Sequence, residues 1–143
     1  MTAMMQSAPL VVQATTKNLV RIREFVKVFA LQSGLADYDA YNIALAVDEA
    51  CANLIQHAYR NDSSKAITVN VTSNDQVIQV EIADDSPPFD PRTADLPDMR
   101  RYFIERRHHG LGILLMSRVM DSIEYHQAET ADSHNLLVLV KHR

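Results

Sequence analysis

Glu49 and Asn53 are four residues apart, which is about one turn of a helix. At this spacing a helix directs a carboxylate and a carboxamide oxygen into the same small volume. Magnesium prefers hard oxygen ligands and keeps several waters, so one protein oxygen plus substrate phosphates is a normal ligand set. A nearby carboxylate could take the proton from an attacking hydroxyl. The pair is a candidate magnesium–nucleotide site, although the helix alone favours the plainer interpretation that both residues face solvent.

The segment around this pair, residues 42–59, has the periodicity of an amphipathic helix at about 100° per residue. Apolar residues share one side: Ile43, Val47, Ala50, Leu54 and Ala58. Polar residues share the other: Asn42, Glu49, Asn53 and Gln56. Asp37 and Asp39 are candidate N-caps for this helix. The single cysteine, Cys51, lies near the apolar side, so we interpret it as a core residue rather than a nucleophile.

Composition limits the classes to which the chain can belong. The 143 residues predict one domain over the whole chain, and 47% apolar with 22% charged residues is typical of a soluble globular protein. A net charge of −4 argues against nucleic acid as a direct partner. No apolar run approaches the ~18 residues of a membrane span, and residues 1–12 lack the basic start of a signal peptide. These features predict a cytosolic protein.

The order of expected elements begins with a short strand at 10–15 and a helix that starts at Thr16 or Asn18 and stops at Gly34. After the second helix, apolar and polar residues alternate over 67–72 and 78–82, with Asn74-Asp75 between them, which predicts an antiparallel hairpin. Three prolines within residues 87–91 cannot continue a strand. Asp84 is therefore expected at a strand end, where turn formation is the plainer explanation for an Asp-Asp pair.

Residues 92–109 are polar and aperiodic, and we interpret them as a lid. An apolar helix follows, opened by Gly110 and Gly112, where exposed backbone N–H groups could meet a phosphate. Alone, this Gly-x-Gly pattern is a weak signal. Residues 122–129 and 136–141 predict a closing hairpin.

Three stretches together resemble a known family. They are Glu-Ala-Cys-Ala-Asn-Leu-Ile-Gln-His-Ala at 49–58, Asp-Asp-Ser-Pro-Pro-Phe-Asp-Pro at 84–91 and Gly-Leu-Gly-Ile-Leu-Leu-Met-Ser-Arg-Val-Met-Asp at 110–121. They are similar to the nucleotide boxes of the anti-sigma-factor serine kinases, in the superfamily of gyrase-, histidine-kinase- and MutL-type ATPases. Residues 134–141 resemble that family's last strand. The resemblance covers nearly the whole chain and implies the Bergerat fold, an α+β two-layer α/β sandwich whose mixed, mostly antiparallel sheet carries helices on one face.

The resemblance also implies roles for individual residues. Asn53 would bind magnesium, Glu49 would be the general base, and Asp84 would accept a hydrogen bond from the adenine amino group, which selects ATP over GTP. Other positions of the boxes and the lid would contact ATP: Ser86, Pro88, Gly110, Leu111, Gly112, and from the lid Arg106, Arg107 or His108.

Three positions depart from the family pattern. Ser86 stands where Asp-x-Gly has its glycine, and serine would cost on the order of 1 kcal/mol if the position needs a positive φ or close approach to adenine. Pro88 stiffens the same loop. His109 precedes Gly110 where many relatives have another glycine. These changes could weaken nucleotide binding, but they remove no catalytic group.

The function implied by the resemblance is an anti-sigma-type serine/threonine kinase that uses Mg-ATP. It would hold a sigma factor, phosphorylate an anti-anti-sigma protein with the sulfate-transporter/anti-sigma-antagonist (STAS) fold, and form a homodimer. Ser86 and the altered lid leave a second hypothesis open, a nucleotide-binding partner switch without phosphate transfer. A third is an ATPase that drives a conformational cycle, against which the lack of a transducer domain counts.

Overall fold

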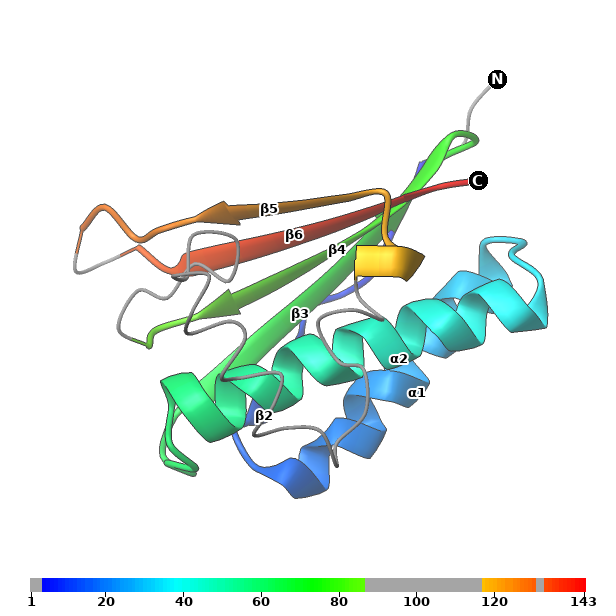
Figure 1. The fold of residues 1–143 in the computed structure, drawn as a ribbon. Helices are drawn as coiled ribbons and strands as arrows, with labels where there is room; N and C mark the ends of the chain where they lie inside the picture. The colour runs from blue at the N-terminus through cyan, green and yellow to red at the C-terminus, as the bar shows by residue number, and fades with distance from the viewer. Residues whose placement is uncertain (1–3, 87–116, 131–132) are drawn as a thin grey trace.

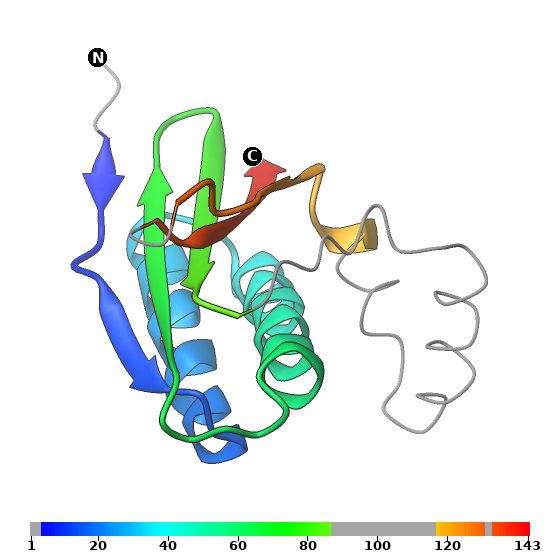
Figure 2. The ribbon, with the colours of Figure 1, turned by 90° about the vertical axis from the view of Figure 1, so that its left-hand side faces the viewer.

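The computed structural model describes residues 4–86, 117–130 and 133–143 in two layers, a six-stranded sheet and two helices that cover one of its faces (Figures 1 and 2). The strands are β1 (Met5–Gln6), β2 (Leu10–Gln13), β3 (Ala66–Ser73), β4 (Val77–Asp84), β5 (Ser122–His126) and β6 (Asn135–His142). The helices are α1 (Leu19–Gln32) and α2 (Asp37–Asn53), with a 3-10 turn at Thr16–Asn18. The predicted α+β sandwich is confirmed.

The sheet has the order β1-β3-β4-β6-β5, and β2 also pairs with β3, so β1 and β2 share one edge. All pairings among the described strands are antiparallel. The central neighbours β4 and β6 are far apart in the chain, yet they pair over the full length of both strands, from Val77 opposite His142 to Asp84 opposite Asn135. This pairing brings two distant sequence stretches together at one end of the sheet.

α1 ends at Gln32, directly before the Ser33–Gly34 turn, so Gly34 stops the helix as the sequence predicted. This glycine has a φ of +96°, a left-handed conformation that side chains disfavour. Its N–H donates to Leu31 O at 3.0 Å, and the next N–H, of Leu35, donates to Ala30 O at 3.1 Å. This pair of bonds is the Schellman arrangement, which satisfies carbonyls at the helix end. The chain then turns directly into α2.

The N-cap prediction for α2 is wrong. Ala36 occupies the cap position, and its side chain makes no capping hydrogen bond. Asp37 and Asp39 lie inside the first turn instead. Carboxylates there still interact favourably with the positive end of the helix dipole, which explains their position without a cap role.

α2 continues as a π-helix over Leu54–Ala58, which the sequence periodicity did not predict. The N–H of Tyr59 donates to Leu54 O, five residues back, at 2.8 Å. A wider turn rotates the residues that follow it. Ile55 and Tyr59 are therefore buried, whereas Leu54 and Ala58, predicted on the apolar side, are only partly buried.

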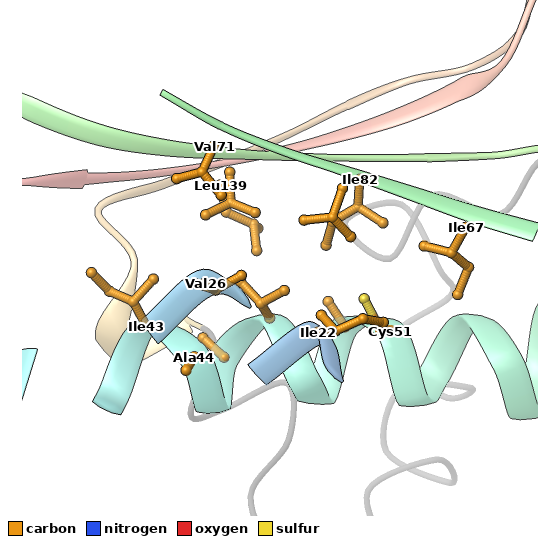
Figure 3. Close-up of a cluster of buried hydrophobic side chains, with 14 of the residues drawn as sticks. Ile22, Val26, Ile43, Ala44, Cys51, Ile67, Val71, Ile82 and Leu139 are labelled. Atoms are coloured by element: carbon orange, nitrogen blue, oxygen red, sulfur yellow. The ribbon is translucent and has the colours of Figure 1, made fainter. Parts of the chain in front are cut away.

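The core lies between the helices and the sheet, and Figure 3 shows side chains of both layers meeting there. Ile22 and Val26 of α1 are fully buried, and the inward side of the predicted hairpin packs over them with Ile67 and Ile82. Cys51 has no exposed surface, which confirms its expected place in the core. No helix among the described residues has the length and apolar character needed to cross a membrane.

The closing hairpin is confirmed by β5 and β6, which pair from Ser122 opposite Val140 to His126 opposite Leu136. Residues 117–119 are helical and match the end of the helix expected after Gly112. The predicted start of that helix, and the predicted lid, lie outside the described residues.

Candidate functional site

Asp84 is the last residue of β4, at the strand end that the sequence predicted. It stands opposite Asn135, the first residue of β6, and opposite Ile67 of β3. Asp84 is 6% exposed and Asn135 is 1% exposed. A carboxylate this deeply buried needs hydrogen-bond partners, because desolvation otherwise makes its charge costly.

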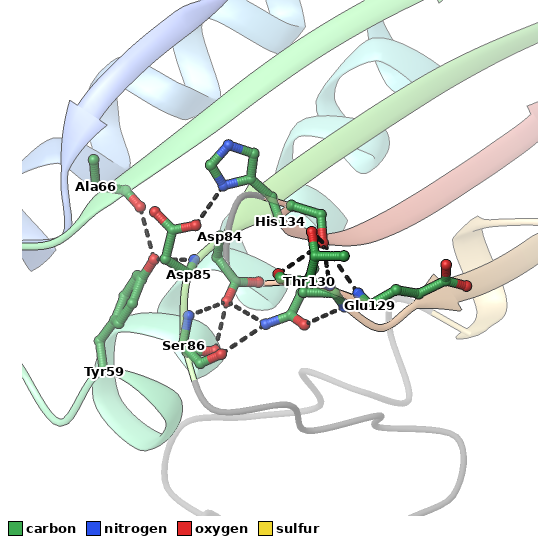
Figure 4. Close-up of polar contacts among 11 residues, drawn as sticks. Tyr59, Ala66, Asp84, Asp85, Ser86, Glu129, Thr130 and His134 are labelled. Atoms are coloured by element: carbon green, nitrogen blue, oxygen red, sulfur yellow. Dashed lines mark hydrogen bonds and ion pairs between the residues drawn. The ribbon is translucent and has the colours of Figure 1, made fainter.

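Its partners all donate to the same oxygen, Oδ1, as the dashed lines of Figure 4 show. Ser86 donates its backbone N–H at 2.8 Å and also its hydroxyl. Asn135 donates through Nδ2 at 3.2 Å, and the same nitrogen donates to Ser86 O at 2.8 Å. Oδ1 is thereby occupied, and the orientation of the carboxylate is set by Ser86, which follows β4, and by Asn135 of β6.

The second oxygen, Oδ2, receives none of the hydrogen bonds described for Asp84. Within the part of the chain that the structure describes, no fully buried side-chain oxygen lacks a partner. Oδ2 therefore keeps some access from outside, although Asp84 as a whole is buried. A carboxylate oxygen in this state can accept a hydrogen bond from an incoming N–H group.

Ser86 does not have the left-handed backbone that a glycine would favour. Among the described non-glycine residues, a positive φ occurs only at Arg60 and Asn61. The conditional cost of a positive φ at Ser86 therefore does not apply. Ser86 is 7% exposed, and both its N–H and its hydroxyl serve Asp84. The departure from Asp-x-Gly thus supplies a partner for the aspartate.

Glu49 and Asn53 both lie on α2 and are partly exposed. Cys51 lies between them in sequence and points from α2 toward the sheet (Figure 3). Burial raises the pKa of the Cys51 thiol, and the negative charges of Asp48 and Asp84 raise it further. Asp84 is thus close enough to this part of α2 to affect it electrostatically. This electrostatic effect relates the end of β4 to the α2 segment that carries Glu49 and Asn53.

Several predicted site residues lie outside the described residues. They are Pro88, Arg106, Arg107, His108, Gly110, Leu111 and Gly112. The structure therefore places Glu49 and Asn53 on α2, and Asp84 and Ser86 at the end of β4. The predicted contacts to the phosphates remain predictions.

Two residues at this corner were not singled out from the sequence, Asn135 and Tyr59. Besides its bonds to Asp84 and Ser86, Asn135 accepts the N–H of Ala128 through Oδ1 at 2.9 Å. An amide at the start of an otherwise apolar strand was the available signal. The Tyr59 hydroxyl donates to Ala66 O at 2.9 Å and accepts the Asp85 N–H at 2.7 Å.

Burial raises the pKa of Tyr59 to about 12, and the charges of Asp84 and Asp85 add to this effect, while the bond from the Asp85 backbone opposes it. The phenol is therefore neutral at ordinary pH and keeps the proton that it donates to Ala66. Its location, directly after the π-helix, could not be obtained from a regular helical wheel.

Comparison with known proteins gives a consistent result. The family described as "Histidine kinase-like ATPase domain" matches residues 12–141. "Serine-protein kinase RsbW" of Bacillus subtilis is 32% identical over 111 residues, which cover 70% of this chain and 69% of that protein. "Serine/threonine-protein kinase BtrW" of Bordetella bronchiseptica is 28% identical over 102 residues, which cover 71% and 70%. The chain therefore belongs to the histidine kinase-like ATPase family.

Proposed function

We propose that this protein is an anti-sigma-type serine/threonine kinase that binds Mg-ATP and phosphorylates a STAS-domain antagonist. The named kinases to which it is similar support the activity. The observation that carries the nucleotide part is the state of Asp84, a buried carboxylate with Oδ1 held by Ser86 and Asn135 and with Oδ2 still accessible. This arrangement fits a base that offers an N–H donor.

Adenine offers such a donor in its exocyclic amino group. Guanine carries a carbonyl oxygen at the same ring position, and a carboxylate would repel it. Because a buried hydrogen-bond group rejects a ligand that cannot pair with it, Asp84 would favour ATP over GTP. Ser86 and Pro88 are proposed to line the same side of the nucleotide.

The chemical step is assigned to α2. Asn53 is proposed to bind Mg²⁺ through its side-chain oxygen, and the ion, when bound, would supply positive charge beside the phosphates. Glu49 is proposed to accept the proton of the substrate hydroxyl as the hydroxyl oxygen bonds to the γ-phosphorus and the bond to the β-phosphate oxygen breaks, releasing ADP. Gly110, Leu111 and Gly112 are proposed phosphate contacts, and Arg106, Arg107 or His108 is proposed as the basic residue that reaches the γ-phosphate.

Partner switching would then follow from charge. The chain has a net charge of −4, and a phosphate on the antagonist adds further negative charge to the pair. The phosphorylated antagonist would be repelled, which would leave the kinase free to hold its sigma factor. A homodimer in the cytoplasm is part of the same proposal.

The proposal is tested with purified protein, radiolabelled ATP, magnesium and a co-encoded STAS protein. Wild type is compared with Glu49→Ala and with a matched control, Glu24→Ala, which removes an exposed glutamate from α1. We expect label on the STAS protein with wild type and the control, and a loss of at least about 100-fold with Glu49→Ala, the usual scale of general-base catalysis.

Two results would contradict this assignment. If Glu49→Ala labels the STAS protein as well as wild type does, Glu49 is not the general base. ATP binding without label in any variant would favour a partner switch that does not transfer phosphate.

A further inference from the structure

Tyr59 joins the end of the helical layer to the end of the sheet. Its side chain follows the π-helix and is 5% exposed. Figure 4 shows the ring pointing to the gap between Ala66 of β3 and Asp85, which follows β4. The hydroxyl bonds to both, as acceptor of the Asp85 N–H at 2.7 Å and donor to Ala66 O at 2.9 Å.

The register of the hairpin shows what this hydroxyl replaces. Ile67 of β3 stands opposite Asp84 of β4, so the next pair along the two strands would be Ala66 and Asp85. In an antiparallel ladder every second opposed pair exchanges N–H to carbonyl bonds. Ala14 N–H bonds to Lys65 O on the β2 side, so the backbone groups of Ala66 face β4 and would bond directly to those of Asp85. Here the Tyr59 hydroxyl lies between these two groups. The strands therefore separate after Asp84, and neither backbone group is left unpaired.

The bridge also sets the peptide group that follows the proposed adenine ligand. The Asp85 N–H and the Asp84 carbonyl belong to one planar peptide unit. Holding that N–H on Tyr59 therefore limits the rotation of the backbone next to the Asp84 side chain. Ser86 and Asn135 hold the carboxylate itself, and Tyr59 holds the backbone that carries it.

Local backbone geometry delivers Tyr59 to this place. The π-helix gives the N–H of Tyr59 a bond to Leu54 O, and Asn61 N–H bonds to Ile55 O at 2.8 Å. The next two residues, Arg60 and Asn61, have φ values of +50° and +61°. Non-glycine residues disfavour this region, so the surrounding contacts must hold it. The π-helix begins directly after Asn53, so the proposed magnesium ligand and Tyr59, which bonds beside Asp84, lie at the same end of the helix.

We propose that Tyr59 is a positioning residue for adenine recognition, which acts by holding the backbone at Asp84 through the bridge between Ala66 and Asp85. This inference rests on the proposed ATP-dependent function. Its expected signature is in selectivity between purine nucleotides rather than in phosphate transfer, because the two hydrogen bonds described for the hydroxyl go to backbone groups of Ala66 and Asp85 beside Asp84.

The test compares ATP with inosine triphosphate, in which a carbonyl replaces the adenine amino group. Dissociation constants for both are measured by calorimetry for wild type, Tyr59→Phe and the control Tyr38→Phe, whose ring is 75% exposed. Deleting the Tyr59 hydroxyl removes one partner each from Asp85 and Ala66. We expect ATP binding to weaken about 3- to 10-fold, inosine triphosphate binding to change less than about twofold, and Tyr38→Phe to match wild type.

Phosphate transfer separates this role from general damage. At saturating ATP, Tyr59→Phe should keep a kcat within about twofold of wild type while its KM for ATP rises with the dissociation constant. Equal weakening for both nucleotides, or a lower melting temperature with unchanged selectivity, would mean that the bridge is merely structural and would overturn the inference.

A second pair of variants covers the case in which Tyr59→Phe does not fold. Asp85→Pro and Asp85→Ala both lose the Asp85 carboxylate, but only proline also loses the N–H that Tyr59 accepts. We expect reduced selectivity in Asp85→Pro alone. If wild type prefers ATP and Asp85→Pro keeps the full preference, the Tyr59 inference is wrong, but the proposed kinase activity is not contradicted. If wild type shows no preference for ATP over inosine triphosphate, Asp84 does not recognise adenine, and the Tyr59 inference, which depends on that role, is also wrong.

Discussion

Two consecutive aspartates at the end of β4 have very different surroundings. Asp84 is 6% exposed and bonds with Asn135, which is 1% exposed. Asp85 pairs with His134, the residue before Asn135, and these two side chains are 56% and 60% exposed. Successive residues of an extended chain point to opposite sides, so one pair faces the protein interior and the other faces water.

Residue type alone therefore does not decide what a carboxylate contributes. The exposed contact between Asp85 and His134 is screened by solvent and is worth about 0–1 kcal/mol. The buried carboxylate must be satisfied by donors, and its one accessible oxygen is then fixed in direction. Recognition should therefore depend on Asp84, while Asp85 matters chiefly through its backbone.

The largest expected effect comes from Asp84→Asn, which alters the buried aspartate. Ser86 and Asn135 donate to Oδ1, so the new amide must keep its oxygen there and turn its NH₂ toward the ligand. A donor would then meet the adenine amino group. Losing a hydrogen bond to a charged group, about 1.5–3 kcal/mol, should weaken ATP binding about 10- to 100-fold.

The same substitution should improve binding of inosine triphosphate, whose carbonyl can accept from the new NH₂. Calorimetric titration of both nucleotides measures the reversal, and Asp84→Ala, which provides neither donor nor acceptor, is the control. ATP binding that is unchanged in Asp84→Asn would contradict the assigned role of this oxygen.

Asn135→Ala should follow in size and act on stability. The change removes one of the three donors to Asp84 Oδ1, a donor to Ser86 O and the acceptor of the Ala128 N–H. Buried groups left without a partner cost about 1–3 kcal/mol, so we expect the free energy of unfolding to fall by that order. Urea denaturation monitored by circular dichroism measures it, and a loss under about 0.5 kcal/mol would show that water replaces the amide.

The raised pKa of Tyr59 predicts a pH dependence of stability. Burial, with the charges of Asp84 and Asp85, moves this pKa from 10.0 to about 12. The folded state then holds the proton more tightly than the unfolded chain. The resulting stability is fully present below about pH 10 and is lost as the pH rises through 12. Urea unfolding should show a steeper alkaline loss in wild type than in Tyr59→Phe, and parallel curves would argue against a buried phenol.

The smallest effect is expected from His134→Ala at the exposed pair. It removes the partner of the Asp85 carboxylate but no buried group. The free energy of unfolding should change by less than about 1 kcal/mol, and ATP binding should stay within about twofold of wild type. A tenfold loss of ATP affinity would show that the solvent-facing pair takes part in recognition and would remove the distinction between the two aspartates.

Much of the fold could be predicted because its signals are local. Alternating apolar residues in β3 and β4 bury one face of a hairpin, and β4 ends at Asp84, as the prolines in the sequence after it predicted. Gly34 ends α1 for an equally local reason, its positive φ. The N-cap of α2 could not be predicted from local signals. Asp37 is a residue type that often caps helices, but the cap position is occupied by Ala36.

Within the candidate site, the sequence predicted that Glu49 and Asn53 share a helix and that Asp84 lies at the end of a strand. What surrounds them was decided by tertiary structure. Asn135 meets Asp84 across 51 residues because β6 pairs with β4, and Tyr59 reaches Asp85 from the end of a π-helix that the sequence did not predict. Sequence periodicity reports each element alone, whereas hydrogen bonds between elements depend on register and burial, which are settled only when the layers pack.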